Sequence, residues 1–323
     1  MSAMPVRRLT LFTSIPPASV RRDRAGIDIG ADYQRRCISS WRAAGHRLIS
    51  LNGVDEAARV AALYPDVEVR PVARTAFERT GRPLVPIAEL LRECAAESDG
   101  RVGLINADLY LHAPGALAKS IEDADDATVV YGRRLDVDDI DAPVAMQTYF
   151  SGLDGFFFAP SAARDLPDEG FVLGETWWDY WLPVVLAKRG CRLKPATDPI
   201  ALHLRHDESA IGMRAPTYLE YFHGFARALS VRLPLPGEEP WAIAARPLLA
   251  AFMRRYRPAA ETTLQIYLSQ FLSLTISLYL MQSPALADTL AAAWRPLLDH
   301  APNEEARSLI RELLDSTAAA GAS

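Results

Sequence analysis

Short apolar runs alternate with segments of helical spacing along the first third of the chain, and this alternation constrains the fold more than any other feature. The runs expected to form strands are 6–14, 47–52, 67–72 and 102–105, and the segments expected to form helices between them are 33–44, 55–64 and 86–96. Repeated strand–helix units are typical of a parallel sheet with helices on both faces. We therefore predict an α/β domain over residues 1–212, built on a mostly parallel sheet flanked by helices.

The remainder of the chain, from residue 213 to 323, has the pattern of an all-helical C-terminal domain. Its most apolar run, 262–281, is close to the ~20 residues that a membrane span needs. Gln265 and Gln270 interrupt this run, so we interpret it as a buried helix or a homo-oligomer interface. Peripheral membrane association is the less favoured alternative.

The composition limits the class of partner and the compartment. A net charge of −5 argues against a nucleic-acid-binding protein, which normally carries a basic patch. The three cysteines, Cys37, Cys94 and Cys191, are odd in number and lack C-x-x-C spacing, which favours a reducing compartment without disulfides. No long apolar run follows the basic residues near the N-terminus, so no signal peptide is evident. We predict a cytoplasmic protein.

Two phosphate-binding motifs are missing. The first expected strand is followed neither by G-x-G-x-x-G nor by G-x-x-x-x-G-K-[ST]. Dinucleotide-dependent dehydrogenases and Walker-type ATPases use these loops to bring backbone amides against phosphates, so neither class is expected. A phosphate-bearing substrate would have to be held by a metal ion and basic side chains.

Polar residues follow the expected strands at the points where each ends. Asn106 and Asp108 come directly after 102–105, and Thr13 ends the first run. Ligands of open α/β sheets bind at the carboxyl ends of the strands, and a carboxylate beside an amide suits a hard divalent cation. The alternative is an ordinary turn, because Asn and Asp also bond their own backbone. Thr13 can contact a nucleotide or simply end its strand.

Further acidic residues precede or open later elements. Asp154, just before an aromatic strand, can reach a substrate hydroxyl or cap a turn. Glu175 and Asp179 lie in a helix expected from Gly174 to Arg189, where a spacing of four places them on one face. They suit general base catalysis or acceptor binding, or they interact with the helix dipole. The acidic run 136–141 is expected to be a solvated loop.

Two histidines stand in the last expected strand of the α/β domain. His203 and His206 point to opposite faces if the strand stays extended, so at most one faces a metal. The alternative is that a histidine at a strand end is structural.

These motifs together resemble the GT-A nucleotide-sugar glycosyltransferases, over residues 6–210. Ile105-Asn106-Ala107-Asp108 is similar to their D-x-D metal motif, with Asn106 in place of the first acid. Residues 152–158 and 174–182 resemble a bacterial and plant branch in which a G-x-D-x-F-x-F strand precedes a G-x-x-x-W-D-N-W-L helix. His203-Leu204-Arg205-His206-Asp207 is similar to the H-Q-N-H-D segment of that branch.

The resemblance implies a transferase that depends on Mn²⁺ or Mg²⁺, with a UDP- or GDP-sugar donor and a glycan or small-molecule acceptor. By position, Asp108 would bind the metal that bridges the donor diphosphate, with Asn106 near the ribose and His206 completing the metal site. Asp179 matches the base of inverting members, and Glu175 is a second candidate. Asn106 removes one negative charge from the metal motif.

Two alternatives to this activity remain. A sugar-phosphate nucleotidyltransferase is built on a similar sheet, but it should carry a glycine- and lysine-containing loop after the first strand, and Ile15-Pro16-Pro17-Ala18-Ser19 is not such a loop. A non-catalytic nucleotide- or sugar-binding protein with the same fold is the other alternative.

Overall fold

The computed structural model describes most of the N-terminal two thirds of the chain. The described residues are 8–23, 26–98, 100–143, 153–175, 177–196 and 199–205, with Tyr221, Arg295 and Arg311 as single positions. By its internal contacts the chain divides into two compact units, Met1–Gly224 and Phe225–Ser323. The predicted helical domain 213–323, with its run 262–281, lies outside the described residues apart from those three positions, all helical. Its boundary at 212 stays a prediction.

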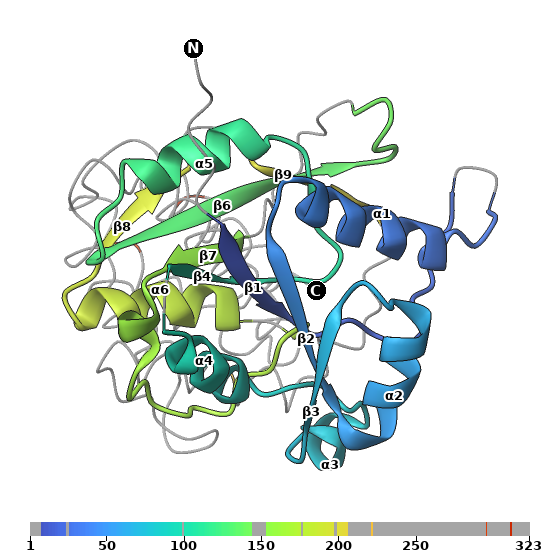
Figure 1. Ribbon diagram of the computed structural model, residues 1–323, viewed down its shortest axis with the longest axis horizontal. Helices are drawn as coiled ribbons and strands as arrows, with labels where there is room; N and C mark the ends of the chain where they lie inside the picture. The colour runs from blue at the N-terminus through green and yellow to red at the C-terminus, as the bar shows by residue number, and fades with distance from the viewer. Residues whose placement is uncertain are drawn as a thin grey trace. The chain divides into compact units, whose positions relative to one another are not determined.

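Nine strands of the described residues form one mixed sheet (Figure 1). They are β1 (Leu9–Thr13), β2 (Arg47–Gly53), β3 (Glu68–Val72), β4 (Arg101–Ile105), β5 (Tyr110–Leu111), β6 (Thr128–Val137), β7 (Leu153–Phe158), β8 (Arg192–Pro195) and β9 (Ala201–Leu204). The order is β3-β2-β1-β4-β7-β6-β9-β5, and β8 also pairs with β6. The first four run parallel, whereas β7 is antiparallel to both of its neighbours. The prediction of a mostly parallel α/β sheet is confirmed.

Helices cover both faces of this sheet. They are α1 (Gly30–Ala43), α2 (Val54–Leu63), α3 (Phe77–Thr80), α4 (Ile87–Ala96), α5 (Pro114–Glu122) and α6 (Trp178–Lys188), with a 3₁₀ turn, η1 (Pro160–Ala163). Figure 1 shows α1 and α5 on the opposite side of the sheet from α4 and α6. None of the helices in the described part of the chain is long and apolar enough to cross a membrane.

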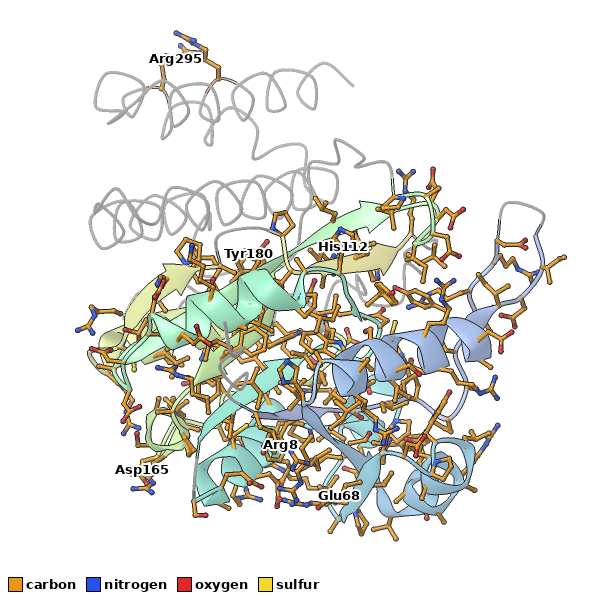
Figure 2. The ribbon with its side chains drawn as sticks, turned by 45° about the horizontal axis from the view of Figure 1, so that its top comes forward. Arg8, Glu68, His112, Asp165, Tyr180 and Arg295 are labelled. Carbon is orange, nitrogen blue, oxygen red and sulfur yellow. The ribbon has the colours of Figure 1, made fainter. Side chains whose placement is uncertain are left out.

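The two faces of β7 illustrate how the core forms. Phe157 belongs to the buried cluster that includes Trp41 of α1 and Leu117 of α5. Phe156 points to the other face, where its ring contacts Trp178 of α6 edge-on, with centroids 5.8 Å apart. Alternate side chains of a strand lie on opposite faces, so the aromatic residues of β7 pack against the helices on both faces of the sheet. Side chains fill the space between the sheet and its helices (Figure 2).

The helix predicted from Gly174 begins only at Trp178, and this corrects the prediction that Glu175 and Asp179 share a helical face. Trp177 has φ of 76° and Gly174 has φ of 87°. Both values lie in the left-handed region, which a right-handed helix cannot include. Glu175 therefore lies in a bend before the helix, and Asp179 lies in its first turn.

The acidic run predicted as a solvated loop is also corrected at its first residue. β6 continues through Val137, and the side chain of Asp136 is only 12% exposed. Cross-strand pairing with Ala201–Leu204 of β9 holds this end of β6 in the sheet. The side chain of Asp136 is therefore available to a buried site.

Candidate functional site

The turn Asn106–Asp108 follows the carboxyl end of β4, as the sequence predicts. Asn106 donates its backbone N–H to the carbonyl of Asp154 on β7, 3.0 Å away. From α1, the side-chain amide of Gln34 donates to the carbonyl of Ala107 at 2.7 Å. The turn is thus held from both the sheet and the helix, which fixes where the Asp108 side chain points.

The hydroxyl of Tyr33 ties this turn to β9. It donates to the carbonyl of Asp108 at 2.8 Å and accepts the backbone N–H of Leu204 at 2.8 Å. Tyr33 lies in α1 and is almost fully buried. One hydroxyl therefore sets the spacing between the end of β4 and the end of β9.

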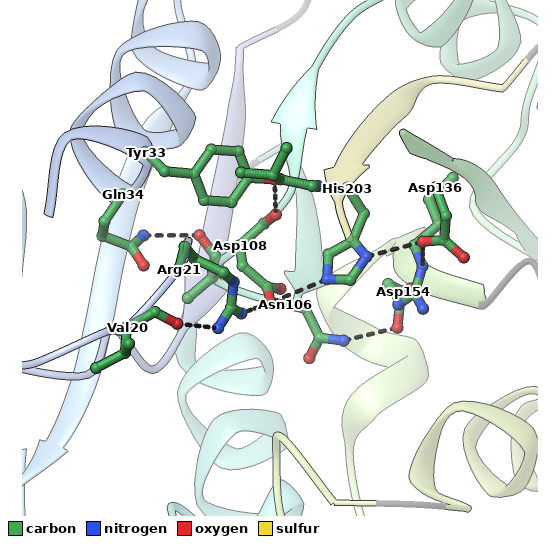
Figure 3. A network of polar contacts seen from close by, with 12 residues as sticks. Val20, Arg21, Tyr33, Gln34, Asn106, Asp108, Asp136, Asp154 and His203 are labelled. Carbon is green, nitrogen blue, oxygen red and sulfur yellow. Dashed lines mark hydrogen bonds and ion pairs between the residues drawn. The ribbon is translucent and has the colours of Figure 1, made fainter. Parts of the chain in front are cut away.

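The carboxylate of Asp108 meets two cationic side chains (Figure 3). Its Oδ2 accepts a hydrogen bond from Arg21 Nη2 at 2.7 Å and lies 3.2 Å from His203 Nε2. Arg21 comes from the loop between β1 and α1, and His203 from β9. Asp108 is the point at which these separate segments meet.

The polar contacts continue from His203 across the sheet. His203 Nδ1 lies 2.8 Å from Asp136 Oδ1, and Arg134 Nε donates to the same oxygen at 3.0 Å. Arg134 also donates through Nη1 to Asp154. Asp154 Oδ1 in turn accepts from Asn106 Nδ2 at 2.6 Å. We call this set the Asp108 network: Arg21, Asn106, Asp108, Arg134, Asp136, Asp154 and His203.

The charges of the network balance. Burial acts to raise the pKa of Asp108, but His203, Arg21 and Arg134 together hold it well below its usual range. Burial and Arg134 act to lower the pKa of His203, yet Asp108 and Asp136 raise it above its ordinary value. With a protonated imidazole, Asp108, Asp136 and Asp154 face three cations, His203, Arg21 and Arg134.

Asp179 interacts electrostatically with two members of this network, Asp154 and Arg134. Burial and the carboxylate of Asp154 raise its pKa well above the usual value, and Arg134 opposes that shift. Two carboxylates that interact electrostatically favour a proton on one of them. Because Asp154 is paired with Arg134 and Asn106, Asp179 is the carboxylate on which the proton is expected.

The structure places the other two predicted residues apart from the network. Burial raises the pKa of Glu175, and the cations that counter it are Arg82 and Arg79, which lie outside the network. Thr13 is 1% exposed, and its hydroxyl has no hydrogen-bond partner in the described part of the chain. The alternation of β1 places Thr13 on the face of Leu9 and Leu11, which α1 covers.

The described residues do not fit a divalent cation held by the protein. They contain no group of three or more His, Cys, Asp or Glu side chains arranged to hold a metal ion. The Asp108 Oδ2 atom already contacts Arg21 and His203, so a cation bound there would lie beside like charges. His206, the second predicted metal ligand, lies outside the described residues.

Sequence reasoning missed three members of the network. Arg21 and Arg134 are not among the candidate residues that the sequence indicated, and Asp136 was placed in the run predicted to be a solvated loop. The signal for the last two was their spacing: residues two apart on one strand share a face. It was missed because the run 136–141 was predicted to be a solvated loop, whereas β6 continues through Val137.

A cavity of about 580 Å³ in the described part of the chain lies at the other end of the strands. Its lining includes Arg8, which precedes β1, and Arg101, the first residue of β4. Asp108 follows the carboxyl end of β4, so this cavity is separate from the network.

No protein-family model and no curated protein matches the sequence. In fold the chain is similar to the mannosyltransferase PcManGT of Pyrobaculum calidifontis, solved with GDP-Man and Mn²⁺ (14% identity, 98% of this chain and 87% of that chain, TM-score 0.44). It is also similar to residues 1–349 of S. aureus TarS (10%, 97% and 91%, 0.45). A nucleotidyl transferase from Methanothermobacter aligns as well (17%, 70% and 99%, 0.38). At these TM-scores the similarity defines neither a family nor an activity.

Proposed function

We propose that the Asp108 network forms the donor site of a glycosyltransferase that moves a sugar from a nucleotide-sugar to an acceptor hydroxyl. The observation that carries the proposal is convergence: Asn106, Asp108 and Asp154 meet at the carboxyl edge of the sheet with two arginines. Ligands of open α/β sheets bind at this edge. Arginine, with its planar fork of donors, suits a diphosphate, and carboxylate and amide groups suit sugar hydroxyls.

The proposed transfer assigns the proton to Asp179. The acceptor oxygen attacks the anomeric carbon, the bond from that carbon to the phosphate oxygen breaks, and its electron pair leaves with the nucleoside diphosphate. The acceptor proton passes to the carboxylate of Asp179, as general base catalysis requires. The raised pKa of Asp179 makes it a stronger base at pH values above that pKa, where its carboxylate is ionised.

The other predicted residues take supporting roles in the proposal. Asn106 lies toward the ribose of the donor and Asp154 toward a sugar hydroxyl. Roles for Thr13 on the nucleotide side, and for Glu175 on the acceptor side or as the second candidate base, stay predictions from the sequence, because neither residue belongs to the network. The class of donor is a UDP- or GDP-sugar.

The transfer also requires positive charge near the departing nucleoside diphosphate. A transition state that develops negative charge is stabilised by preorganised positive groups. Mn²⁺ or Mg²⁺ at Asp108 and His206 is the source predicted from the sequence. Arg21 and His203 are a second source, within the described residues.

A thermal-shift screen tests the donor site. UDP, GDP and their sugar conjugates are each added with and without Mn²⁺, because a ligand that binds the folded state raises its stability. We expect one nucleotide to shift the melting temperature, with loss of the shift in Asp108→Ala. The matched control is Asp138→Ala, an exposed acid of the same region, paired at 3.6 Å with Arg205. No shift with any nucleotide would reject the transferase.

A second assay separates the alternatives once a nucleotide is found. Release of nucleoside diphosphate in the presence of acceptors supports transfer. Release of pyrophosphate from a nucleoside triphosphate and a sugar phosphate supports a nucleotidyltransferase instead. Binding without either release supports a non-catalytic binding protein.

A further inference from the structure

We propose that Arg21, oriented by Asp108, binds the diphosphate of the donor directly, so that donor binding requires no divalent metal ion. This inference rests on the proposed function and specifies how its donor site holds charge. It assigns Arg21 as a phosphate-binding residue. It also changes the role of Asp108 from metal ligand to positioning residue.

The guanidinium of Arg21 has a donor left for a ligand. Its Nη2 donates to Asp108 and its Nη1 donates to the carbonyl of Val20 at 3.1 Å. Its Nε is buried and has no hydrogen-bond partner in the described part of the chain. The Arg21 side chain is 14% exposed, and each of its two Nη atoms carries a second N–H. A phosphate oxygen can accept hydrogen bonds from these groups, because arginine and phosphate geometries match.

The loop that carries Arg21 is fixed before any ligand arrives. The Arg21 backbone N–H donates to Asp28 Oδ1 at 3.1 Å, and its carbonyl accepts from the N–H of Ile29 at 2.7 Å. Asp28 Oδ1 also accepts the N–H of Gly30, the first residue of α1, at 2.9 Å. A Cβ added at Gly30 would lie 1.8 Å from the carbonyl oxygen of Ser19, so this close approach needs glycine.

Electrostatics favour the Arg21 guanidinium over a metal ion as the partner of the Asp108 carboxylate. A divalent cation on the Asp108 carboxylate would lie close to the guanidinium of Arg21, which donates to the same oxygen. The like charges would repel one another. A diphosphate meets the opposite situation, because it approaches a group that is already cationic. Asp108 then fixes the orientation of Arg21, as a carboxylate that hydrogen-bonds to a ligand-binding side chain often does.

Calorimetric titration with inorganic pyrophosphate, UDP and GDP, each in EDTA and in Mn²⁺, tests the inference. We expect the wild-type protein to bind in EDTA. Arg21→Ala should weaken that binding at least about tenfold, because a charge-assisted hydrogen bond is lost. Arg21→Gln, which retains most of the side chain, is the second variant, and urea denaturation checks that both fold. The matched control is Arg22→Ala, a neighbour whose guanidinium donates only to the carbonyl of Gly26, at 2.9 Å, among the described residues.

The positioning role of Asp108 has its own readout. Asp108→Asn should weaken binding in EDTA, and Mn²⁺ should not change the affinity of either protein. The outcomes are distinguishable. Wild-type binding that needs Mn²⁺, or binding in EDTA that Arg21→Ala leaves unchanged, overturns this inference and leaves the proposed function standing. Absence of binding by all three probes under both conditions overturns the proposed function as well.

Discussion

His203 Nε2 lies 3.2 Å from Asp108 Oδ2, although 95 positions separate the two residues in the chain. The other ring nitrogen of His203 contacts Asp136 at 2.8 Å, so one imidazole joins two carboxylates. The contact is possible because β9 pairs with both β6 and β5, which brings His203 beside the chain that leaves Asp108. The network is therefore part of the fold and not an addition to its surface.

Replacing the bridging imidazole should destabilise the protein. In His203→Gln, Asp108 and Asp136 each lose a cationic partner while they remain largely buried. We expect a loss of about 1–3 kcal/mol in the free energy of unfolding, the usual cost of an unsatisfied buried polar group. Urea denaturation measures it. The control is His112→Gln, at an exposed position, where a change within about 0.5 kcal/mol is expected. Equal effects of the two substitutions would contradict the bridging role.

Two glycines should respond in opposite directions to alanine. A Cβ at Gly103 of β4 would lie 2.6 Å from Leu11 and 2.8 Å from Phe157, so Gly103→Ala should cost about 1–3 kcal/mol by overpacking. A Cβ at Gly115 in α5 meets nothing within 4 Å. Gly115→Ala should stabilise by about 0.4–1 kcal/mol, because alanine loses less conformational freedom on folding. Urea denaturation of both variants measures the two effects, and a stabilising Gly103→Ala would disprove the packing at this crossing.

His46 should make stability fall in acid. Burial lowers its pKa from 6.5 to about 4, so between these values the unfolded chain binds a proton that the folded chain excludes. The free energy of unfolding therefore rises with pH through this window. Acidification from pH 6.5 to 4 should lower it by up to about 3 kcal/mol, at about 1.4 kcal/mol per pKa unit. The free energy of unfolding at several pH values measures this slope. His46→Phe should show a smaller slope than the wild type, and an unchanged slope would assign the acid sensitivity elsewhere.

Asp179 should control the rate of transfer and not the binding of donor, if the proposed function holds. Asp179→Asn removes the proton acceptor, so we expect kcat to fall about 10²–10⁴-fold, the usual contribution of a general base. The affinity for the nucleoside diphosphate should change little. Because burial and Asp154 raise the pKa of Asp179, the acidic limb of the pH–rate profile should lie above the usual range of a carboxylate. Asp154→Asn should move that limb to lower pH, and the opposite movement would exclude Asp179 as the base.

The elements of the parallel half follow from local sequence. The runs predicted at 47–52 and 67–72 are found as β2 and β3, and the segment predicted at 86–96 is found as α4. Each is short and has one periodicity, set by which side chains must be buried, so neighbouring residues suffice to define it. The turn at Asn106 and Asp108 is equally local, because it is simply where an apolar strand ends.

At the start of α6, tertiary packing overrides the local backbone preferences of the sequence. A tryptophan rarely adopts a positive φ, so the residue types around Gly174 do not predict that the helix begins only at Trp178. Trp177 is 0% exposed, and burial of this large side chain outweighs the preference of its backbone. This choice separates Glu175 from Asp179 and leaves only Asp179 beside the network.

The sequence by itself determined the alternating strands and helices, the apolar strand that ends at Asn106, and the acidic and amide side chains available there. Only the tertiary structure decided which cations those side chains meet. Arg21 follows β1, Arg134 lies on β6 and His203 on β9, and the strand order β1-β4-β7-β6-β9 brings these three segments together. Periodicity records whether a side chain is buried, but the pairing of distant strands is set by the packing of the whole sheet. The partners of Asp108 are consequently a property of the fold and not of any stretch of sequence.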